Sequence, residues 1–279
     1  MNNNLVTTFP KIENLYDAFI VDIWGVVYDG NNAFEGASEA INRVLNSQKK
    51  VIFLSNTPRP SDITKIKLIE LGIEMDKARI YTSGDAVREQ LKSWSDSIFS
   101  KLGRKFYHLG EERNQDILRN LDVTTAEIIE DADFILQTLY MDEDEDLSKY
   151  DDFLARSFKI GLPMICANPD TIVSHGDKKR YCAGTFAKKY SDLGGIVHYY
   201  GKPDQKVFDK ISSLLIEEGI DKSKILMIGD TMETDIFGAH SSGLDSLLLL
   251  TGNGSAIAKN MELLKDYSFL PSWIAPKLV

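Results

Sequence analysis

Polar side chains that could take part in catalysis follow two predicted strands near the start of the chain. Asp22 comes directly after the apolar run 18–21, and Ser55 and Asn56 come directly after the apolar run 51–54. Because the carboxyl ends of parallel strands open into the crevice where α/β sheets bind ligands, we expect these side chains to meet there. A carboxylate in such a crevice can act as a nucleophile or bind a metal ion, while a hydroxyl group and free backbone N–H groups suit phosphate oxygens.

A lysine and two further carboxylates occupy similar positions later in the chain. Lys202 lies between a glycine and a helix-initiating proline, an arrangement that can hold a positive charge against a carboxylate or a phosphate group. Asp230 follows the apolar run 225–228, and Asp235 comes five residues later. Magnesium prefers a few hard oxygen ligands and retains water, so Asp22 and Asp230 together predict a magnesium site. Asp235 would orient a metal-bound water or, alternatively, complement the dipole of the helix that it begins.

Strands and helices alternate in the segments that carry these residues. The apolar runs have the length of strands, and the segments after them show the spacing of apolar side chains that is typical of an amphipathic helix. Three such units are expected: strand 18–21 with a helix around 37–45, strand 51–54 with a helix around 63–71, and strand 225–228 with a helix around 236–240 before strand 247–250. Repeated strand-loop-helix units predict an α/β fold, with a Rossmann-like parallel-sheet core formed by residues 1–82 and 196–279.

The middle of the chain alternates in its own right. Strands are expected at 105–109, 134–136 and 164–167, separated by helical segments. We therefore predict an inserted α/β cap domain over residues 83–195. The acidic run 142–146 is interpreted as a solvated loop, because clustered carboxylates without glycine-spaced ligands rarely bind calcium.

Composition limits the classes of partner. The 279 residues are 43% hydrophobic and carry a formal net charge of -10, so the chain has no general positive field and nucleic acid is not an expected partner. No apolar run approaches the roughly 20 residues that span a bilayer, and the first residues do not resemble a secretory signal. We therefore expect a cytoplasmic protein that does not bind membranes, with Cys166 and Cys182 as reduced thiols. The sequence leaves the oligomeric state open, and a homo-oligomer is one alternative.

In this order, the four polar segments resemble the four sequence motifs of the haloacid dehalogenase superfamily, and the likeness covers nearly the whole chain. The first motif is similar to Asp22-Ile23-Trp24-Gly25-Val26, the second to Ser55, the third to Lys202, and the fourth to Gly229-Asp230 with Asp235. The insertion between the second and third motifs, together with Gly201-Lys202-Pro203 and Asn168-Pro169-Asp170, resembles the class IIA branch. That branch includes sugar-phosphate, nucleotide and nitrophenyl-phosphate phosphatases.

The resemblance implies a magnesium-dependent hydrolase that acts on a small phosphorylated metabolite. Asp22 would be the nucleophile that forms an aspartyl-phosphate, which divides one difficult displacement into two easier steps. Asp22, the backbone carbonyl of Trp24 and Asp230 would bind Mg²⁺, and Asp235 would support the metal shell.

The same resemblance assigns residues to the phosphoryl group and to the cap. Ser55 and Asn56 would hold the phosphoryl oxygens, and Lys202 would neutralise the charge that builds on them. Asn168 and Asp170 are candidate site residues of the cap, although a simple turn at Asn-Pro-Asp explains them about as well.

One position departs from the motif of superfamily phosphatases. These enzymes usually carry a second aspartate two residues after the nucleophile, which protonates the leaving group and activates water, but this chain has Trp24 there. An indole has no proton to exchange near neutral pH, so Trp24 cannot fill this role. Asp29, on the adjoining loop, is a candidate replacement, and an ordinary turn aspartate before glycine is the alternative.

Three functions are compatible with this pattern. The first is a phosphatase with a good leaving group or a replacement acid, the second is another phosphoryl-centred or carbon-centred member of the superfamily, and the third is a phosphate-ester-binding or regulatory protein with little turnover. A response-regulator receiver also uses a strand-end aspartate, a hydroxyl residue and a lysine. The chain is longer than a lone receiver, however, and Gly229-Asp230 would have no role there.

Overall fold

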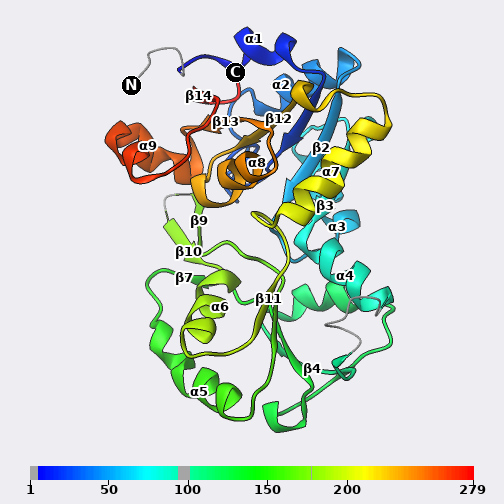
Figure 1. Cartoon of the computed structure of the whole chain (residues 1–279), viewed down its shortest axis with the longest axis vertical. Coiled ribbons are helices and arrows are strands. Elements are labelled where there is room, and N and C mark those ends of the chain that lie inside the picture. Colours follow the sequence, from blue (N-terminus) through cyan, green and yellow to red (C-terminus); the bar gives the residue numbers. More distant parts are fainter. Residues whose placement is uncertain (1–5, 94–100, 177) are drawn as a thin grey trace.

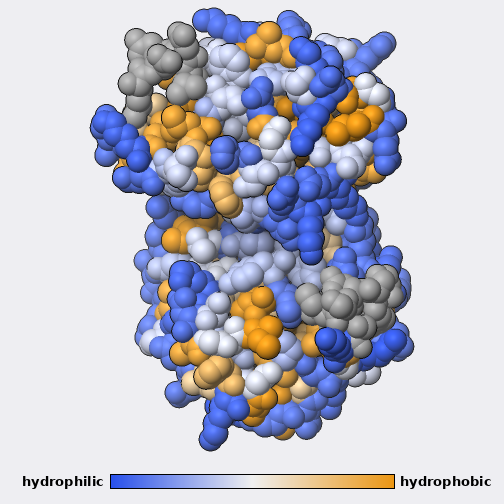
Figure 2. Space-filling view, viewed as in Figure 1, coloured by the Kyte–Doolittle hydropathy of each residue, from blue (hydrophilic) through white to orange (hydrophobic). Residues whose placement is uncertain are grey.

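The computed structural model describes residues 6–93, 101–176 and 178–279. In Figure 1 the chain forms an upper lobe, passes into a lower lobe and then returns to complete the upper one, where the C-terminus lies. Figure 2 shows the same face as two lobes joined at a narrower middle. This course is the one expected for an insertion within an α/β core.

Within the described residues, the upper lobe is built on a six-stranded sheet with the order β14-β13-β12-β1-β2-β3, in which every neighbouring pair is parallel. The strands are β1 (Ala18–Val21), β2 (Lys50–Ser55), β3 (Arg79–Thr82), β12 (Ile225–Gly229), β13 (Asp245–Leu249) and β14 (Trp273–Ala275). Every residue of β1 and β12 is buried, as expected for parallel strands that are covered on both faces. The predicted Rossmann-like core is confirmed.

Helices cover both faces of this sheet. The helices of the upper lobe are α1 (Phe9–Ile12), α2 (Ala37–Asn46), α3 (Ser61–Glu70), α7 (Gln205–Glu217), α8 (Phe237–Ser241) and α9 (Ser255–Lys259). Because side chains alternate along a strand, Phe19 and Val21 pack against α2, whereas Ala18 and Ile20 pack against α7 and α8. The two layers of helices leave the carboxyl ends of the strands free to carry polar residues.

The lower lobe has a second parallel sheet, with five strands in its described part and the order β11-β8-β6-β4-β5. Its strands are β4 (Lys105–Leu109), β5 (Thr124–Thr125), β6 (Phe134–Gln137), β8 (Met164–Cys166) and β11 (Val197–Tyr199). Helix α4 (Ser83–Ser93) packs on one face through Val87, and α5 (Asp151–Lys159) and α6 (Ala183–Asp192) pack on the other through Leu154 and Phe186. A small antiparallel sheet of β7 (Met141–Asp142), β10 (Lys178–Tyr181) and β9 (Ile172–His175) lies beside it.

The second sheet extends past residue 195, where the sequence suggests that the insertion ends. Strand β11 pairs with β8 and so belongs to the lower lobe, although its residues lie in the segment assigned to the core. An apolar run by itself does not show which sheet it joins, because the pairing partner is decided by packing. At the other end, α4 begins at Ser83 and packs under the lower sheet, close to the expected boundary.

The structure describes the helices and the two cysteines on which the expectations about membranes and thiols depend. In the ranges that it describes, no helix combines the length and apolar character needed to cross a bilayer. Cys166 and Cys182 are both buried and free, as expected for reduced thiols.

Candidate active site

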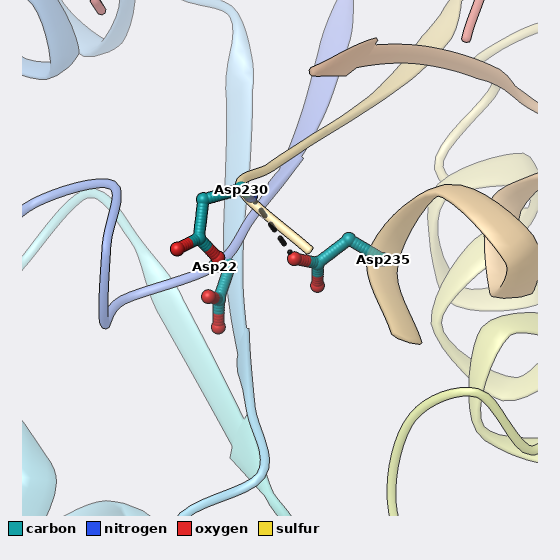
Figure 3. A group of neighbouring side chains, drawn as sticks. All are labelled: Asp22, Asp230 and Asp235. Atoms are coloured by element: carbon teal, nitrogen blue, oxygen red, sulfur yellow. Dashed lines mark hydrogen bonds between the residues drawn. The ribbon is translucent and has the colours of Figure 1, made fainter. Parts of the chain in front are cut away.

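Three carboxylates gather at the carboxyl ends of two neighbouring strands, as Figure 3 shows. Asp22 follows β1 and Asp230 follows β12, and the parallel pairing of these strands sets the two residues side by side. One oxygen each of Asp22, Asp230 and Asp235 lie within 4.8 Å of one another. All three residues are buried, with exposed fractions of 6%, 5% and 0%. The structure therefore brings together the residues in which the sequence predicts a metal site.

The ammonium group of Lys202 joins two of these carboxylates. Its Nζ lies 2.5 Å from Asp22 Oδ1 and 2.7 Å from Asp235 Oδ1. Lys202 is only 2% exposed, and a buried charge is tolerated because it is paired on two sides. Burial acts against the charged form, but Asp22 and Asp235 outweigh it and raise the pKa of Lys202.

Asp235 holds the loop that carries Asp230. Its Oδ2 accepts hydrogen bonds from the backbone N–H groups of Asp230 and Thr231, each at 3.1 Å (Figure 3 draws the first). Asp235 can reach back because it lies in a π-helical turn, Met232–Ile236, a rare conformation that is frequent at functional sites. Since both of its oxygens have protein partners, Asp235 is suited to positioning its neighbours.

The loop after β13 fixes Asp230 from the other side. Asp230 Oδ2 accepts a hydrogen bond from the backbone N–H of Asn253 at 2.7 Å, and Oδ1 accepts one from the Thr231 hydroxyl at 2.9 Å. The carboxylate also lies directly against Gly25 and Gly252, where an added Cβ would be 1.9 Å and 2.0 Å from Oδ2. Both glycines have positive φ, 77° and 47°, so a side chain is excluded by space and by backbone conformation.

The charges of the site suit a divalent cation. The single ammonium group of Lys202 balances only one of the three buried carboxylates. Burial, and then the neighbouring Asp235, raise the pKa of Asp230 to about 7, and burial raises the pKa of Asp22 although Lys202 opposes it. A cation bound by Asp22 and Asp230 would offset this cost, and carboxylate oxygens are the ligands that magnesium prefers. The residues present therefore fit a magnesium ion.

Ser55 and Asn56, which the sequence assigns to phosphate binding, have different surroundings. Ser55 lines the same cavity as Asp22. The Asn56 amide instead donates to the Lys202 carbonyl at 3.0 Å and to Asp170 Oδ1 at 2.8 Å, and its Oδ1 accepts the Lys202 N–H at 2.7 Å. The Asn56 side chain thus holds the Lys202 segment against the lower lobe. Any contact of Asn56 with phosphate would come from its backbone.

A cavity of about 300 Å³ extends from Asp22 and Ser55 between the two lobes. Asn168 and Asp170 line it as well. Asn168 Oδ1 accepts the Asp170 N–H at 3.1 Å, so the Asn-Pro-Asp segment also makes the simple turn expected as the alternative. Burial raises the pKa of Asp170, while Lys202 and Asn56 oppose the shift.

Asp29 is not among the described residues that line this cavity. Its Oδ1 accepts the backbone N–H groups of Asn31 and Asn32, both at 2.8 Å. These are the bonds of an ordinary turn aspartate, which was the alternative to an acid-base role. Asp170 therefore shares the cavity with Asp22, whereas Asp29 does not.

Three cavity residues near Trp24 carry no signal in the sequence: Tyr28, Tyr140 and His175. The Trp24 indole lies 4.8 Å from the Tyr28 ring and 5.6 Å from the His175 ring, measured between centroids. His175 belongs to the lower lobe, as does Tyr140, whose hydroxyl lies 2.8 Å from His175 Nδ1. Isolated aromatic residues are common in cores, so only the approach of the two lobes reveals this group.

Comparisons with known proteins agree with the motifs. A family model described as haloacid dehalogenase-like hydrolase matches residues 19–124, and a second, described as HAD-hydrolase-like, matches residues 199–279. The chain is 31% identical over 243 residues to the sugar-phosphatase AraL of Bacillus subtilis, which covers 84% of this chain and 83% of that protein. It is 25% identical over 262 residues to the ribonucleotide monophosphatase NagD of Escherichia coli, covering 93% and 95%. A crystal structure of a haloacid dehalogenase-like hydrolase from Brucella suis matches with a TM-score of 0.84 and 32% identity, over 99% of this chain and 100% of that one.

Proposed function

The chain belongs to the haloacid dehalogenase-like hydrolase family, and we propose that it is a magnesium-dependent phosphohydrolase acting on a small phosphate ester. The observation that carries the proposal is the buried group of Asp22, Lys202, Asp230 and Asp235. It combines a carboxylate that faces a cavity with a fixed positive charge and a pair of carboxylates that fit a divalent cation. The names of two relatives, the sugar-phosphatase AraL and the ribonucleotide monophosphatase NagD, support the same reaction class.

Hydrolysis would proceed in two displacements at phosphorus. Asp22 attacks, a bond forms between its carboxylate oxygen and phosphorus, and the bond from phosphorus to the leaving oxygen breaks. Water then attacks the aspartyl-phosphate, the bond between Asp22 and phosphorus breaks, and phosphate leaves with Asp22 restored. Ser55 and Lys202 would hold the phosphoryl oxygens throughout. Magnesium, held by Asp22, Asp230 and the Trp24 carbonyl, would supply positive charge to the same oxygens, and Asp235 would keep Asp230 and Lys202 in place.

Proton transfer requires a group other than Trp24. We assign it to Asp170, which lines the cavity with Asp22 and whose pKa burial raises. In its protonated form Asp170 would donate to the leaving oxygen, and it would then take a proton from the attacking water. Asp29 is a weaker candidate, because its carboxylate is engaged in a turn.

The lower lobe would act as a cap. We place this domain over residues 83–195, with β11 as an extension of its sheet, and the core over residues 1–82 and 196–279. The Asn-Pro-Asp turn of the cap contacts the core through the hydrogen bond between Asp170 and Asn56. Closure of the cap would therefore bring Asp170 to the site at the same time. Closure would exclude water from the aspartyl-phosphate and select the ester.

Trp24 also favours a second candidate function. A family member without the usual acid could bind phosphate esters and regulate a partner with little turnover. Such a protein would need the phosphate-binding groups Ser55 and Lys202 and the cavity, but it would not need Asp170. The two functions differ in phosphate release, not in ligand binding.

Phosphate release tests the proposal directly. Wild type and Asp22→Asn would be assayed against sugar phosphates, nucleotides and nitrophenyl phosphate, with magnesium and with a chelator. We expect release only from wild type with magnesium. Beryllium fluoride, which mimics an aspartyl-phosphate, should bind wild type but not Asp22→Ala. Binding of beryllium fluoride without phosphate release from any ester would favour the regulatory function.

A further inference from the structure

We propose that the leaving group of the ester carries a planar unsaturated ring, held beside Trp24, and a second anionic group, held by Lys67 and Arg113. The inference rests on the proposed function, because it names the class of ester that the site takes. It follows from the part of the cavity that lies beyond the phosphoryl group.

The cavity has room for such a leaving group. Its volume is about 300 Å³, and pockets of roughly 300–1,000 Å³ hold small-molecule ligands. Asp22 and Ser55 mark the end where phosphorus would react. The remainder lies between the lobes and is lined by residues of both.

Four rings form an aromatic wall in this remainder: Trp24, Tyr28, Tyr140 and His175. Trp24 is central, since its ring centroid lies 4.8 Å from that of Tyr28, 5.6 Å from that of His175 and 6.5 Å from that of Tyr140. Trp24 also lines the smaller recess that contains Asp22 and Asp230, so this residue is shared by the reacting end and the larger cavity. Flat π faces that line the cavity favour a planar ring over a saturated one.

His175 takes part in the wall as a neutral ring. Asn31 Oδ1 lies 2.8 Å from His175 Nε2 and can only accept, so Nε2 carries the proton. Nδ1 then accepts the Tyr140 hydroxyl, also at 2.8 Å. Burial, and next the guanidinium of Arg180, lower the pKa of His175, which agrees with this assignment.

Three cations line the same cavity, and their own carboxylate partners do not. Arg59, Lys67 and Arg113 line it, while the partners, Asp116, Glu70 and Glu111, lie outside. Among the described lining residues, the carboxylates are Asp22 and Asp170, which belong to the phosphoryl end. Away from Asp22 and Asp170, the described lining therefore offers cationic groups and no carboxylate, with Lys67 contributed by the core and Arg113 by the lower lobe.

Four phosphonates, which cannot be hydrolysed, test both features by calorimetric titration with magnesium present. They are benzylphosphonate, its ring-carboxylated form, cyclohexylmethylphosphonate and its carboxylated form. We expect the aromatic ring to tighten binding about fivefold and the carboxylate about threefold. The ring-carboxylated benzylphosphonate should bind tightest.

Matched variants assign each gain to its residues. Arg113→Gln should remove the carboxylate gain, whereas Arg156→Gln, at a cap arginine with similar side-chain exposure (63% against 60%), should keep it. Lys67→Gln should weaken that gain, and Lys65→Gln, on an exposed site of the same helix, should not. Trp24→Leu should remove the ring gain alone. Melting temperatures would show that each variant is folded.

The outcomes separate this inference from the proposed function. Equal binding of the four phosphonates, no binding, or gains that survive in Arg113→Gln and Trp24→Leu would overturn the inference, even if esters are hydrolysed. The expected order of affinity would support it, even if wild type released no phosphate and the hydrolase proposal failed.

Discussion

Lys202 and Asp22, which stand 180 positions apart in the sequence, form a buried ion pair with 2.5 Å between Nζ and Oδ1. Asp22 lies at the end of the first core strand, and Lys202 lies where the chain re-enters the upper lobe. The pair therefore requires that the chain return to the upper lobe after the insertion. Its burial makes each charge dependent on the other.

Removing the lysine should expose this dependence. Lys202→Met leaves Asp22 and Asp235 buried without their cation, so we expect the free energy of unfolding to fall by about 3–5 kcal/mol in urea titrations. Lys210→Met is the control, because Lys210 pairs with Glu89 at the surface, and its loss should cost less than about 1 kcal/mol. Equal losses in the two variants would contradict the proposed role of the pair.

Magnesium should stabilise the protein through Asp230. At a concentration of 100 times its dissociation constant, a ligand that binds only the folded state adds about 2.7 kcal/mol to the free energy of unfolding. Asp230→Asn should lose most of this gain, whereas Asp144→Asn, in the exposed acidic run, should keep it. Thermal and urea unfolding with and without magnesium measure the effect. If magnesium stabilised Asp230→Asn as much as wild type, Asp230 would not be a magnesium ligand.

Asp170 should matter most for poor leaving groups. General acid-base catalysis contributes about 10²–10⁴-fold, and an alkoxide needs the proton more than nitrophenolate does. In Asp170→Asn we expect kcat/KM for an alkyl phosphate to fall by about that factor and for nitrophenyl phosphate to fall much less. Asp29→Asn, which preserves the turn, should change neither by more than about threefold. If Asp29→Asn lost alkyl-phosphate turnover and Asp170→Asn did not, Asp29 would be the general acid-base instead of Asp170.

A second carboxylate at position 24 should substitute for Asp170. In wild type, Trp24→Asp should raise alkyl-phosphate turnover less than about tenfold, since an acid is already present. In the Asp170→Asn background the same change should restore a larger share of the lost rate, because the two groups would serve one step and their effects would not add. The test is the ratio of the kcat/KM values for activated and alkyl esters. It is measured in wild type, Trp24→Asp, Asp170→Asn and the double variant. Additive effects would show that Asp170 and position 24 act separately.

The lower lobe should lose stability in mild acid through His108. Burial lowers its pKa to about 4, and its Nε2 lies 2.7 Å from Thr138 Oγ1. The unfolded chain binds this proton below its usual pKa of about 6.5 and the folded chain only below about 4. The free energy of unfolding should therefore fall as the pH decreases from about 6.5 to 4. Urea titrations of wild type and His108→Gln isolate the effect, and identical pH dependence in the two proteins would exclude it.

The sequence by itself determined the sheet of the core and the polar residues that follow its strands. β1 coincides with the predicted run 18–21, and β2 and β12 contain the other two predicted strands. Local information suffices here, because buried parallel strands are continuous apolar runs and the polar residue that follows each one is set by chain order. The convergence of Asp22 and Asp230 then follows from strand pairing.

The tertiary structure alone decided how the two lobes share the cavity. Asn31 and His175 are 144 positions apart, and no spacing rule predicts their contact. The strands β9 and β10 that carry His175 to Trp24 are half-exposed, so they lack the apolar pattern of a strand. Asn56 shows the same limit, because its type predicts phosphate binding whereas its neighbours Lys202 and Asp170 occupy its amide. Contacts of this kind depend on which surfaces meet after each lobe has folded, and that information is not present in any one segment of the sequence.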